Sequence, residues 1–254
     1  MKIGLVQYNP AWEDKTTNQV RLQELLKESS PDVSLLIFTE MTLTGFTMAS
    51  KENAEDFDGQ TVKFFASLAR HHDCHILAGS IEKATPLPFN SLIHLNPKGE
   101  LVTTYRKIHT IPYYNEHLHY QNGASLAVTK IKDFRIGLSI CFDLRFPELY
   151  RSYIDENVHM VLNIANWPAT RAHHWKTLMR ARAIENQCYM VGVNRVGTGN
   201  GIGFSGGSNV VDPIGEELLK PSSNECVLTV ELTLETVKAA RQSFPVLELK
   251  RIKV

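Results

Sequence analysis

The sequence predicts a layered α/β fold over residues 1–254. Short apolar segments typical of strands alternate with longer segments whose apolar residues recur at helical spacing. One strand candidate, 33–38, is a near-continuous apolar run, as expected of a strand covered on both faces of its sheet. Hairpin patterns are interleaved with this alternation, and we find no linker, low-complexity tract or internal repeat. We therefore expect a single domain of stacked sheets and helices.

The first half of the chain supplies strands, two helices and one clear hairpin. Three leucines (22, 25 and 26) share one helical face, and Asn96-Pro-Lys-Gly99 is a hairpin turn signature. The expected elements are, in chain order, a strand at 2–7, a loop at 9–14, a helix at 17–27, a strand at 33–38, a helix at 61–71, a strand at 75–81 and paired strands at 90–95 and 100–105.

The second half is expected to begin with a loop at 113–122, which is aromatic and polar without a clear period. Pro147 is placed to open a helix after the strand that ends at Ile140. The other expected elements are strands at 125–129, 134–140, 158–164 and 188–194, a helix at 172–188, a glycine-rich loop at 197–207, late strands at 208–211, 216–220 and 227–231, and a helix at 234–242.

Composition excludes several classes of partner. Lys plus Arg and Asp plus Glu each number 27, so a formal net charge of zero gives no electrostatic case for nucleic acid or an anionic membrane. No apolar run approaches the roughly 18 residues of a membrane span. The first eight residues begin as a strand and lack the pattern of a signal peptide, so we expect a cytoplasmic protein.

The four cysteines are widely spaced and form no C-x-x-C pair. This argues against a structural zinc site or a disulfide framework, and it suits a reducing cytosol. The positions are Cys74, Cys141, Cys188 and Cys226.

Glu40, Lys107 and Cys141 each lie just past the carboxyl end of an expected strand. In open α/β sheets, ligands collect outside these strand ends. A free thiol has a pKa near 8.5, so a nucleophilic cysteine needs a base to take its proton and a cation to favour the thiolate. Glu40 is a candidate base, and Lys107 is a candidate for stabilising the thiolate and then an oxyanion.

Each of the three residues also has a plain structural alternative. Cys141 is alternatively a buried, inert thiol, because free cysteines are among the most buried residues. Glu40 is alternatively a helix cap, and Lys107 a solvated surface charge. Spacing in the sequence does not establish that the three side chains meet.

Three ordered blocks of this sequence resemble the signature blocks of the nitrilase superfamily of carbon–nitrogen hydrolases. They are Thr39-Glu40-Met-Thr-Leu-Thr-Gly45, Tyr105-Arg-Lys107-Ile-His109 and Cys141-Phe-Asp-Leu-Arg145-Phe-Pro-Glu148. The resemblance covers nearly the whole chain. It implies a four-layer α-β-β-α sandwich, a catalytic triad of Glu40, Lys107 and Cys141, and assembly as a homodimer or larger through helical faces.

Shorter blocks resemble the omega-amidase branch, whose members hydrolyse the terminal amide of short 2-oxo dicarboxylic acid monoamides. They are Glu116-His-Leu-His-Tyr120, Ala165-Asn-Trp-Pro168, Ala181-Arg-Ala-Ile-Glu-Asn-Gln187 and Asn194-Arg-Val-Gly197. In this resemblance Glu116 is a second glutamate near the triad that orients Lys107 or the substrate. Phe142, Asn166 and Trp167 are expected to contact the substrate.

The mechanism implied is covalent and needs no metal or organic cofactor. The Cys141 thiolate attacks the amide carbon, while Lys107 and a backbone N–H near Phe142 hold the oxyanion. Ammonia leaves with a proton supplied through Glu40, which then activates water to hydrolyse the thioester. The partners implied are a small-molecule amide and water.

Further residues are candidates for the substrate pocket. Arg171 follows a strand end and is a candidate for binding a substrate carboxylate. Arg145 is expected to be structural, paired with Asp143 or Glu148, with contact to a substrate carboxylate as the alternative. Tyr113, Tyr114 and Tyr120 are candidates for the acyl pocket, with plain loop packing as the alternative.

Rival motifs fail on their context. Gly203-Phe-Ser205-Gly-Gly207 matches G-x-S-x-G, but no helix follows it and no histidine lies downstream. The overlapping G-x-G-x-x-G pattern lies far from the first strand–helix unit. The pairs His71-His72 and His117-Leu-His119 lack a complementary ligand set for a metal. A papain-like pairing of Cys141 with His159 or His173 leaves Glu40 and Lys107 unexplained.

The function expected is therefore an amidase that forms a cysteine thioester and acts on 2-oxoglutaramate or 2-oxosuccinamate. One alternative is another reaction on the same scaffold, such as that of a nitrilase or an N-carbamoyl amidohydrolase. The other is a non-catalytic binding protein that keeps the scaffold.

Overall fold

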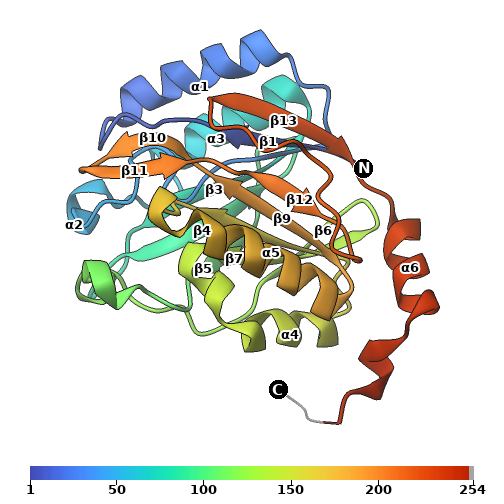
Figure 1. Ribbon diagram of the computed structural model, residues 1–254. Coiled ribbons are helices and arrows are strands. Elements are labelled where there is room, and N and C mark those ends of the chain that lie inside the picture. The colour runs from blue at the N-terminus through green and yellow to red at the C-terminus, as the bar shows by residue number, and fades with distance from the viewer. Residues whose placement is uncertain (252–254) are drawn as a thin grey trace.

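The apolar run 33–38 is covered on both faces, as its composition predicts. In the computed structural model, which describes residues 1–251, its central part forms the short strand β2 (Leu35–Ile37). Leu35 and Ile37 enter a core between two sheets, whereas Leu36 and Phe38 enter a second core beneath two helices. This alternation divides the molecule into four layers, helix–sheet–sheet–helix (Figure 1).

The first sheet has the strand order β13-β1-β2-β3-β4-β5. β1, β2 and β3 run parallel, and β5 runs in the same direction because it is antiparallel to β4, which is antiparallel to β3. The bounds are β1 (Lys2–Gln7), β3 (His75–Glu82), β4 (Phe89–Leu95), β5 (Leu101–Arg106) and β13 (Cys226–Glu231).

The second sheet has the strand order β12-β9-β8-β7-β6, with β7, β8 and β9 parallel. Its inner face packs against the first sheet through Ile136, Leu138 and Ile140, all fully buried. Burying one such side chain contributes roughly 1.5–3 kcal/mol, so this inner core holds the sheets together. The bounds are β6 (Val128–Ile131), β7 (Phe134–Ile140), β8 (Met160–Ala165), β9 (Tyr189–Asn194) and β12 (Asn209–Val211).

Two helices cover each outer face. α1 (Lys15–Ser29) and α3 (Gln60–His72) lie on the first sheet, and α4 (Pro147–Asp155) and α5 (Ala172–Asn186) lie on the second (Figure 1). The remaining helices are α2 (Ser50–Asn53), α6 (Leu234–Ser243) and the 3-10 helices η1 (Pro112–Tyr114), η2 (Glu116–Leu118), η3 (Cys141–Arg145), η4 (Ala169–Arg171) and η5 (Val246–Leu249). None of the helices among residues 1–251 has both the length and the apolar character of a membrane span.

The glycine-rich tract 197–207 is a hairpin, and the expectation of a loop is wrong. β10 (Val196–Gly199) pairs with β11 (Ile202–Ser205) around a turn at Asn200 and Gly201, both with positive φ. Asn-Gly at the centre of a two-residue turn is a strong hairpin signal.

The expected strand at 216–220 is also wrong. The Asp212 carboxylate accepts the N–H groups of Ile214 and Glu216, which closes a turn, and a single bridge between Val211 and Glu217 remains. The strand expected at 125–129 begins three residues later, as β6.

Candidate active site

Three strand ends place Glu40, Lys107 and Cys141 at one edge of the sandwich. Glu40 follows β2 and Lys107 follows β5, which run in the same direction in the first sheet. Cys141 follows β7 of the second sheet directly. The side chains of Glu40 and Lys107 are 0% exposed, which excludes a solvated surface role for Lys107.

Lys107 is held by two carboxylates. Its Nζ donates to Glu40 Oε1 at 3.0 Å and to both oxygens of Glu116, at 2.9 and 3.0 Å. The Asn90 amide on β4 donates to the same two carboxylates, at 2.8 Å to Glu40 Oε1 and 3.0 Å to Glu116 Oε1. The four side chains form one buried cluster in which two acids share a single ammonium group and a single amide.

Glu116 is delivered by the segment expected to be an irregular loop. That segment contains η1 and η2, and Glu116 is the first residue of η2. Glu116 Oε2 also accepts the Ile111 N–H at 2.7 Å, so the start of the segment is tied to the same carboxylate that holds Lys107.

Asn166 connects Glu40 to the second sheet. It follows β8, and its backbone N–H donates to Glu40 Oε2 at 2.8 Å. Its side-chain amide donates to the Glu40 carbonyl at 2.7 Å and to Oε2 at 3.3 Å. The same backbone N–H lies close enough to the Cys141 thiol to lower its pKa. Asn166 therefore lies between the carboxylate and the thiol.

Cys141 lies on a sharp turn where β7 becomes η3. Its φ of 47° is in the left-handed region, which a residue with a Cβ adopts at a cost of order 1–3 kcal/mol. Two residues on, the buried Asp143 carboxylate accepts the Ile140 N–H at 3.0 Å and stabilises the turn. Pro147 begins α4, as expected from its position.

Burial and charge act in opposite directions on the site. Burial raises the pKa of the Cys141 thiol well above its usual value, the Glu40 and Glu116 charges raise it further, and Lys107 opposes them. The two carboxylates outweigh desolvation and raise the pKa of Lys107, which keeps it protonated. Burial, more than the nearby Glu40 charge, raises the pKa of Glu116, against the effect of Lys107. The net effect is a raised pKa for the Cys141 thiol, which favours the neutral form over the thiolate.

A cavity of about 680 Å³ opens onto Cys141. Asn166, Trp167, Arg171, Tyr113 and Phe142, the candidates for substrate contact, all line it. So do residues that the sequence did not single out for this role, namely Phe46, Ile111, Pro112, Pro168 and His174.

Arg145 lines this cavity, and its expected ion pair with Asp143 or Glu148 is wrong. The guanidinium lies 4.7 Å from the centre of the Trp167 ring and 5.8 Å from that of Phe142. Asp143 is occupied by other donors. Burial and the neighbouring Arg171 lower the pKa of Arg145, a sign that two like charges face the same space.

Arg171 and two of the three candidate tyrosines line the cavity. The Arg171 guanidinium lies 5.1 Å from the centre of the Tyr113 ring, and Arg171, Tyr113 and Tyr114 all line the cavity. Tyr120 is not in the wall. Its hydroxyl donates to the Thr47 carbonyl at 2.7 Å inside a separate small core, so plain packing is the correct interpretation.

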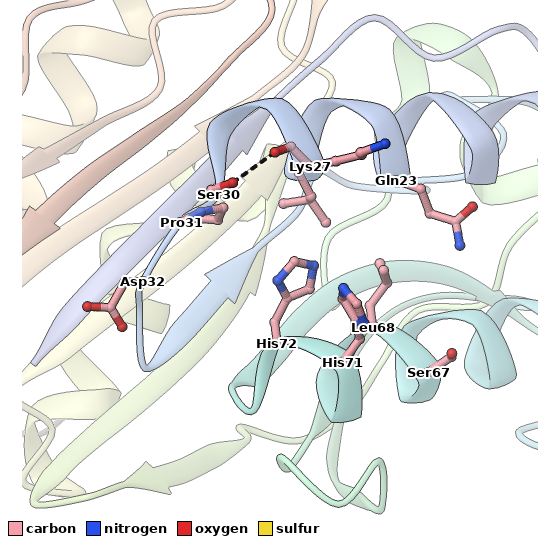
Figure 2. A pocket seen from close by; sticks show the side chains of 10 residues that line it. Gln23, Lys27, Ser30, Pro31, Asp32, Ser67, Leu68, His71 and His72 are labelled. Atoms are coloured by element: carbon pink, nitrogen blue, oxygen red, sulfur yellow. Dashed lines mark hydrogen bonds between the residues drawn. The ribbon is translucent and has the colours of Figure 1, made fainter.

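A second hollow of about 580 Å³ lies between α1 and α3 on the outer helical layer. Figure 2 shows Gln23 and Lys27 of α1 facing Ser67, His71 and His72 of α3 across it. It contains none of the residues that cluster at the strand ends. Across residues 1–251 there is no group of three or more His, Cys, Asp or Glu side chains arranged for a metal ion.

Sequence reasoning missed Asn90 and preferred the wrong surroundings for Arg145. Asn90 lies inside a hairpin strand and belongs to no functional motif. The signal that could have identified it is a polar amide within an apolar strand pattern. Arg145 was assigned to a local ion pair, because sequence distance favours partners that three-dimensional packing does not provide.

Comparisons with known proteins agree with this geometry. The family model described as carbon-nitrogen hydrolase matches residues 2–242. An omega-amidase of Yersinia enterocolitica is 36% identical over 96% of this chain and 94% of its own length. A 2-oxoglutaramate amidase of Bacillus subtilis is 28% identical over 97% of this chain and 96% of its own.

A solved structure is also similar over the whole chain. The protein XC1258 of Xanthomonas campestris, a CN-hydrolase superfamily member with an arsenic adduct in its active site, superimposes with a TM-score of 0.95 and is 33% identical. The match covers 100% of this chain and 98% of that one, which confirms the expected sandwich fold.

Proposed function

The chain belongs to the carbon–nitrogen hydrolase family, and from this premise we propose that it is an omega-amidase. Family membership makes it an enzyme that hydrolyses carbon–nitrogen bonds of small amides with water. The proposal adds the substrate class, a short 2-oxo dicarboxylic acid with one terminal amide, such as 2-oxoglutaramate or 2-oxosuccinamate. Relatives with the names omega-amidase and 2-oxoglutaramate amidase support it.

The observation that carries the substrate class is the pair Arg145 and Arg171. Both guanidinium groups face the cavity that opens onto Cys141, and neither has a carboxylate partner among residues 1–251. A bidentate hydrogen bond to a carboxylate is the strong interaction that an unpaired arginine offers. An acid carried at one end and an amide at the other would span from the arginines to the thiol.

The proposed acylation uses Glu40, Lys107 and Cys141 in the roles of base, electrostatic stabiliser and nucleophile. Glu40 takes the thiol proton as sulfur attacks the amide carbon, which explains how a thiol with a raised pKa reacts at neutral pH. Lys107 and the Phe142 backbone N–H hold the oxyanion. Collapse of the intermediate breaks the C–N bond, and the proton on Glu40 leaves with ammonia.

Deacylation repeats these roles with water. Glu40 removes a proton from water as it attacks the thioester carbonyl, and the sulfur leaves with that proton to restore the thiol. Glu116 is proposed to support the reaction by orienting Lys107, which it contacts through both oxygens. Asn166, Trp167, Phe142 and Tyr113 form the acyl pocket, and no metal or organic cofactor takes part.

We further propose that the enzyme acts in the cytoplasm as a homodimer. The balanced charge and the unpaired cysteines support the compartment. Ile184 on α5 and Ile214 beside it are both largely exposed, which supports a contact through that helical face.

The test is ammonia release from 2-oxoglutaramate and 2-oxosuccinamate beside glutamine, N-carbamoyl amines, simple nitriles and neutral butyramide. We expect turnover of the two 2-oxo monoamides and none in Cys141→Ala. Exclusive turnover of nitriles or carbamoyl compounds, or substantial activity in Cys141→Ala, would contradict the proposal.

Arginine variants test the substrate class separately. Arg145→Gln and Arg171→Gln should each raise KM for the anionic monoamides about tenfold or more, because a charge-assisted hydrogen bond contributes about 1.5–3 kcal/mol. Hydrolysis of butyramide, which has no carboxylate, is the control and should change little. An equal loss on both substrates would show that the arginines serve the fold instead.

A further inference from the structure

One buried carboxylate connects the turn of the nucleophile to the strand end that carries Lys107. Asp143 is 0% exposed and lies in η3, two residues after Cys141. It has no Lys or Arg partner among residues 1–251, and four hydrogen bonds from the chain satisfy it. The catalytic steps proposed above do not use this group.

On one side, Asp143 stabilises the turn at Cys141. Its Oδ2 accepts the N–H of Ile140, the residue immediately before the nucleophile, at 3.0 Å. Cys141 adopts a φ of 47°, which a residue with a Cβ keeps only when its surroundings enforce it. The hydrogen bond to Asp143 is such a constraint.

On the other side, Asp143 binds the two residues that flank Lys107 at equal spacing. Tyr105, two residues before Lys107, donates its hydroxyl to Oδ2 at 2.7 Å. His109, two residues after it, approaches Oδ1 through its backbone N–H at 2.9 Å and its ring Nδ1 at 2.7 Å. The His109 ring is also stacked on Phe146, with centroids 3.6 Å apart and planes 7° apart.

These contacts cross between the two sheets. Tyr105 belongs to β5 of the first sheet, and the Ile140 turn ends β7 of the second. Each sheet contributes part of the triad. The inner apolar core holds the two sheets together, but the relative position of their strand ends depends on interactions at the edge of the sandwich. Directional hydrogen bonds to the Asp143 carboxylate fix the relative position of the two strand ends, which non-directional apolar contacts do not fix.

We propose that Asp143 is a positioning residue that sets Cys141 relative to Lys107 through Ile140 on one side and Tyr105 and His109 on the other. The proposal rests on the triad assigned under the proposed function. It goes beyond that function by adding a group that touches no substrate but determines the geometry of attack. Burial and the Asp143 charge both raise the pKa of Tyr105, so its hydroxyl remains a donor to the carboxylate throughout the working pH range.

Removal of single hydroxyl groups provides a matched test. Tyr105→Phe deletes a bond on the Lys107 side of Asp143. Tyr150→Phe deletes an equally buried hydroxyl that is hydrogen-bonded to Ser139 at 2.8 Å and to Asn163 at 3.1 Å. This control variant keeps every hydrogen bond to Asp143. Both variants should lower the urea midpoint similarly. We expect kcat to fall about tenfold in Tyr105→Phe with KM nearly constant, since small misplacement of reacting groups mainly costs rate, and kcat to stay within about twofold in Tyr150→Phe.

A second measurement does not depend on which amide is hydrolysed. Butyraldehyde and a cysteine thiol form a hemithioacetal. The sulfur forms a bond to the carbonyl carbon, the π electrons of the carbonyl move onto its oxygen as an alkoxide, and the thiol proton passes to Glu40. This adduct needs Cys141 and Lys107 in the same relative position as the acylation step. Its inhibition constant should rise about tenfold in Tyr105→Phe and about a hundredfold in Asp143→Asn, and remain unchanged in Tyr150→Phe.

The outcomes separate this inference from the proposed function. If the wild type hydrolyses other amides than those named, the aldehyde series still tests the role of Asp143. Equal losses in Tyr105→Phe and Tyr150→Phe, or unchanged kcat and aldehyde affinity in Tyr105→Phe, would overturn it.

Discussion

Cys141 lies in surroundings that oppose its ionisation. Burial is the largest influence, and of the three nearby charged groups two are acidic and one is basic. In the proposed mechanism the nucleophile is activated at the moment of attack, by transfer of its proton to Glu40. It is not stored as a thiolate. This distinguishes the site from those in which a cysteine pairs with a protonated histidine.

The reactivity of Cys141 should follow its raised pKa. In a Cys226→Ser background, we expect the rate of alkylation by iodoacetamide to keep rising from pH 7 to about pH 9.5. A raised pKa moves the onset of thiolate to higher pH, so no plateau should appear near the ordinary value of about 8.5. The buried Cys74 and Cys188, with pKa values raised to about 11 and about 12 by burial, should remain unreactive.

Two variants sharpen this measurement. Lys107→Met removes the cation that lowers the thiol pKa and should slow alkylation further, and Cys141→Ala reports the background. A plateau at or below about pH 8 would show that the thiolate is already stabilised in the resting enzyme.

The sequence was enough to identify three candidate catalytic residues, and the family resemblance added Glu116, but Asn90 and Asp143 were not found. Glu40, Lys107 and Cys141 could be found because strand ends are visible as the end of an apolar run. Asn90 acts through contacts at the strand ends of one sheet, and Asp143 through contacts across the two sheets. Such contacts have no local sequence pattern. For the same reason Arg145 was assigned to its sequence neighbours, whereas its actual surroundings are the rings of Phe142 and Trp167.

At the scale of elements, β3 supports the segment that carries Glu40. Gly79 in this strand donates its N–H to the Thr39 carbonyl at 3.1 Å and accepts the Thr42 N–H at 3.1 Å. A Cβ at position 79 would lie 2.3 Å from the Met41 nitrogen and 2.7 Å from the Glu40 Cα. The backbone around Glu40 is therefore packed directly on a glycine.

Gly79→Ala should both destabilise the protein and lower its activity. Overpacking costs typically about 1–3 kcal/mol, and the displaced backbone here carries the proposed general base. Urea unfolding and kcat measure the two effects.

Gly203→Ala is the matched control for this substitution. A Cβ at position 203, in β11, would meet nothing within 4 Å and has no positive φ to accommodate. This variant should leave both stability and kcat near the wild-type values. A Gly79→Ala enzyme with normal kcat would show that the Glu40 segment tolerates displacement.

The errors in the expected elements have physical causes. Three glycines among the eight strand residues of the hairpin β10–β11 weaken its strand pattern, and its Asn200-Gly201 turn was the better signal. Residues 216–220 are Glu-Glu-Leu-Leu-Lys, which do not alternate strictly, and the Asp212 side chain takes the Glu216 N–H that a strand would use. Long apolar segments such as 75–81 and 134–140 were located well because burial decides them.

At the scale of the whole molecule, a polar contact between His94 and Thr129 connects the two sheets. His94 on β4 meets Thr129 of β6 at 2.6 Å through Nδ1 and His75 of β3 at 2.9 Å through Nε2. Burial, with the neighbouring His75, lowers the pKa of His94 to about 3. The folded protein therefore keeps this imidazole neutral across most of the acidic range.

Acid should destabilise the fold through His94. In the unfolded chain, His94 binds a proton below its ordinary pKa of about 6.5, whereas in the folded chain it binds one only near pH 3. The free energy of unfolding therefore falls as pH drops through this window. One such group contributes a slope of up to about 1.4 kcal/mol per pH unit. Urea unfolding between pH 7 and pH 4.5 measures this slope.

Two asparagine variants isolate the histidine. His94→Asn should be less stable at pH 7 but lose less stability per pH unit, because the titrating group is gone. His117→Asn, at an exposed position, should keep the wild-type slope. Identical slopes in all three proteins would assign the acid sensitivity to other groups.

The layered fold could be predicted from the sequence because burial on one or both faces leaves a pattern in each strand. The relative position of the two sheets could not. It depends on contacts such as those of Asp143 and His94, which pair residues about 35 positions apart without any repeating pattern.

The shared ammonium of Lys107 has a consequence for the end of the reaction. Glu40 and Glu116 already divide Lys107 and Asn90 between them. Hydrolysis of a neutral amide creates a third carboxylate next to Cys141, beside two carboxylates that already share one ammonium group. We expect like-charge repulsion from Glu40 and Glu116 to weaken binding of the acid at this end of the cavity and to favour its release.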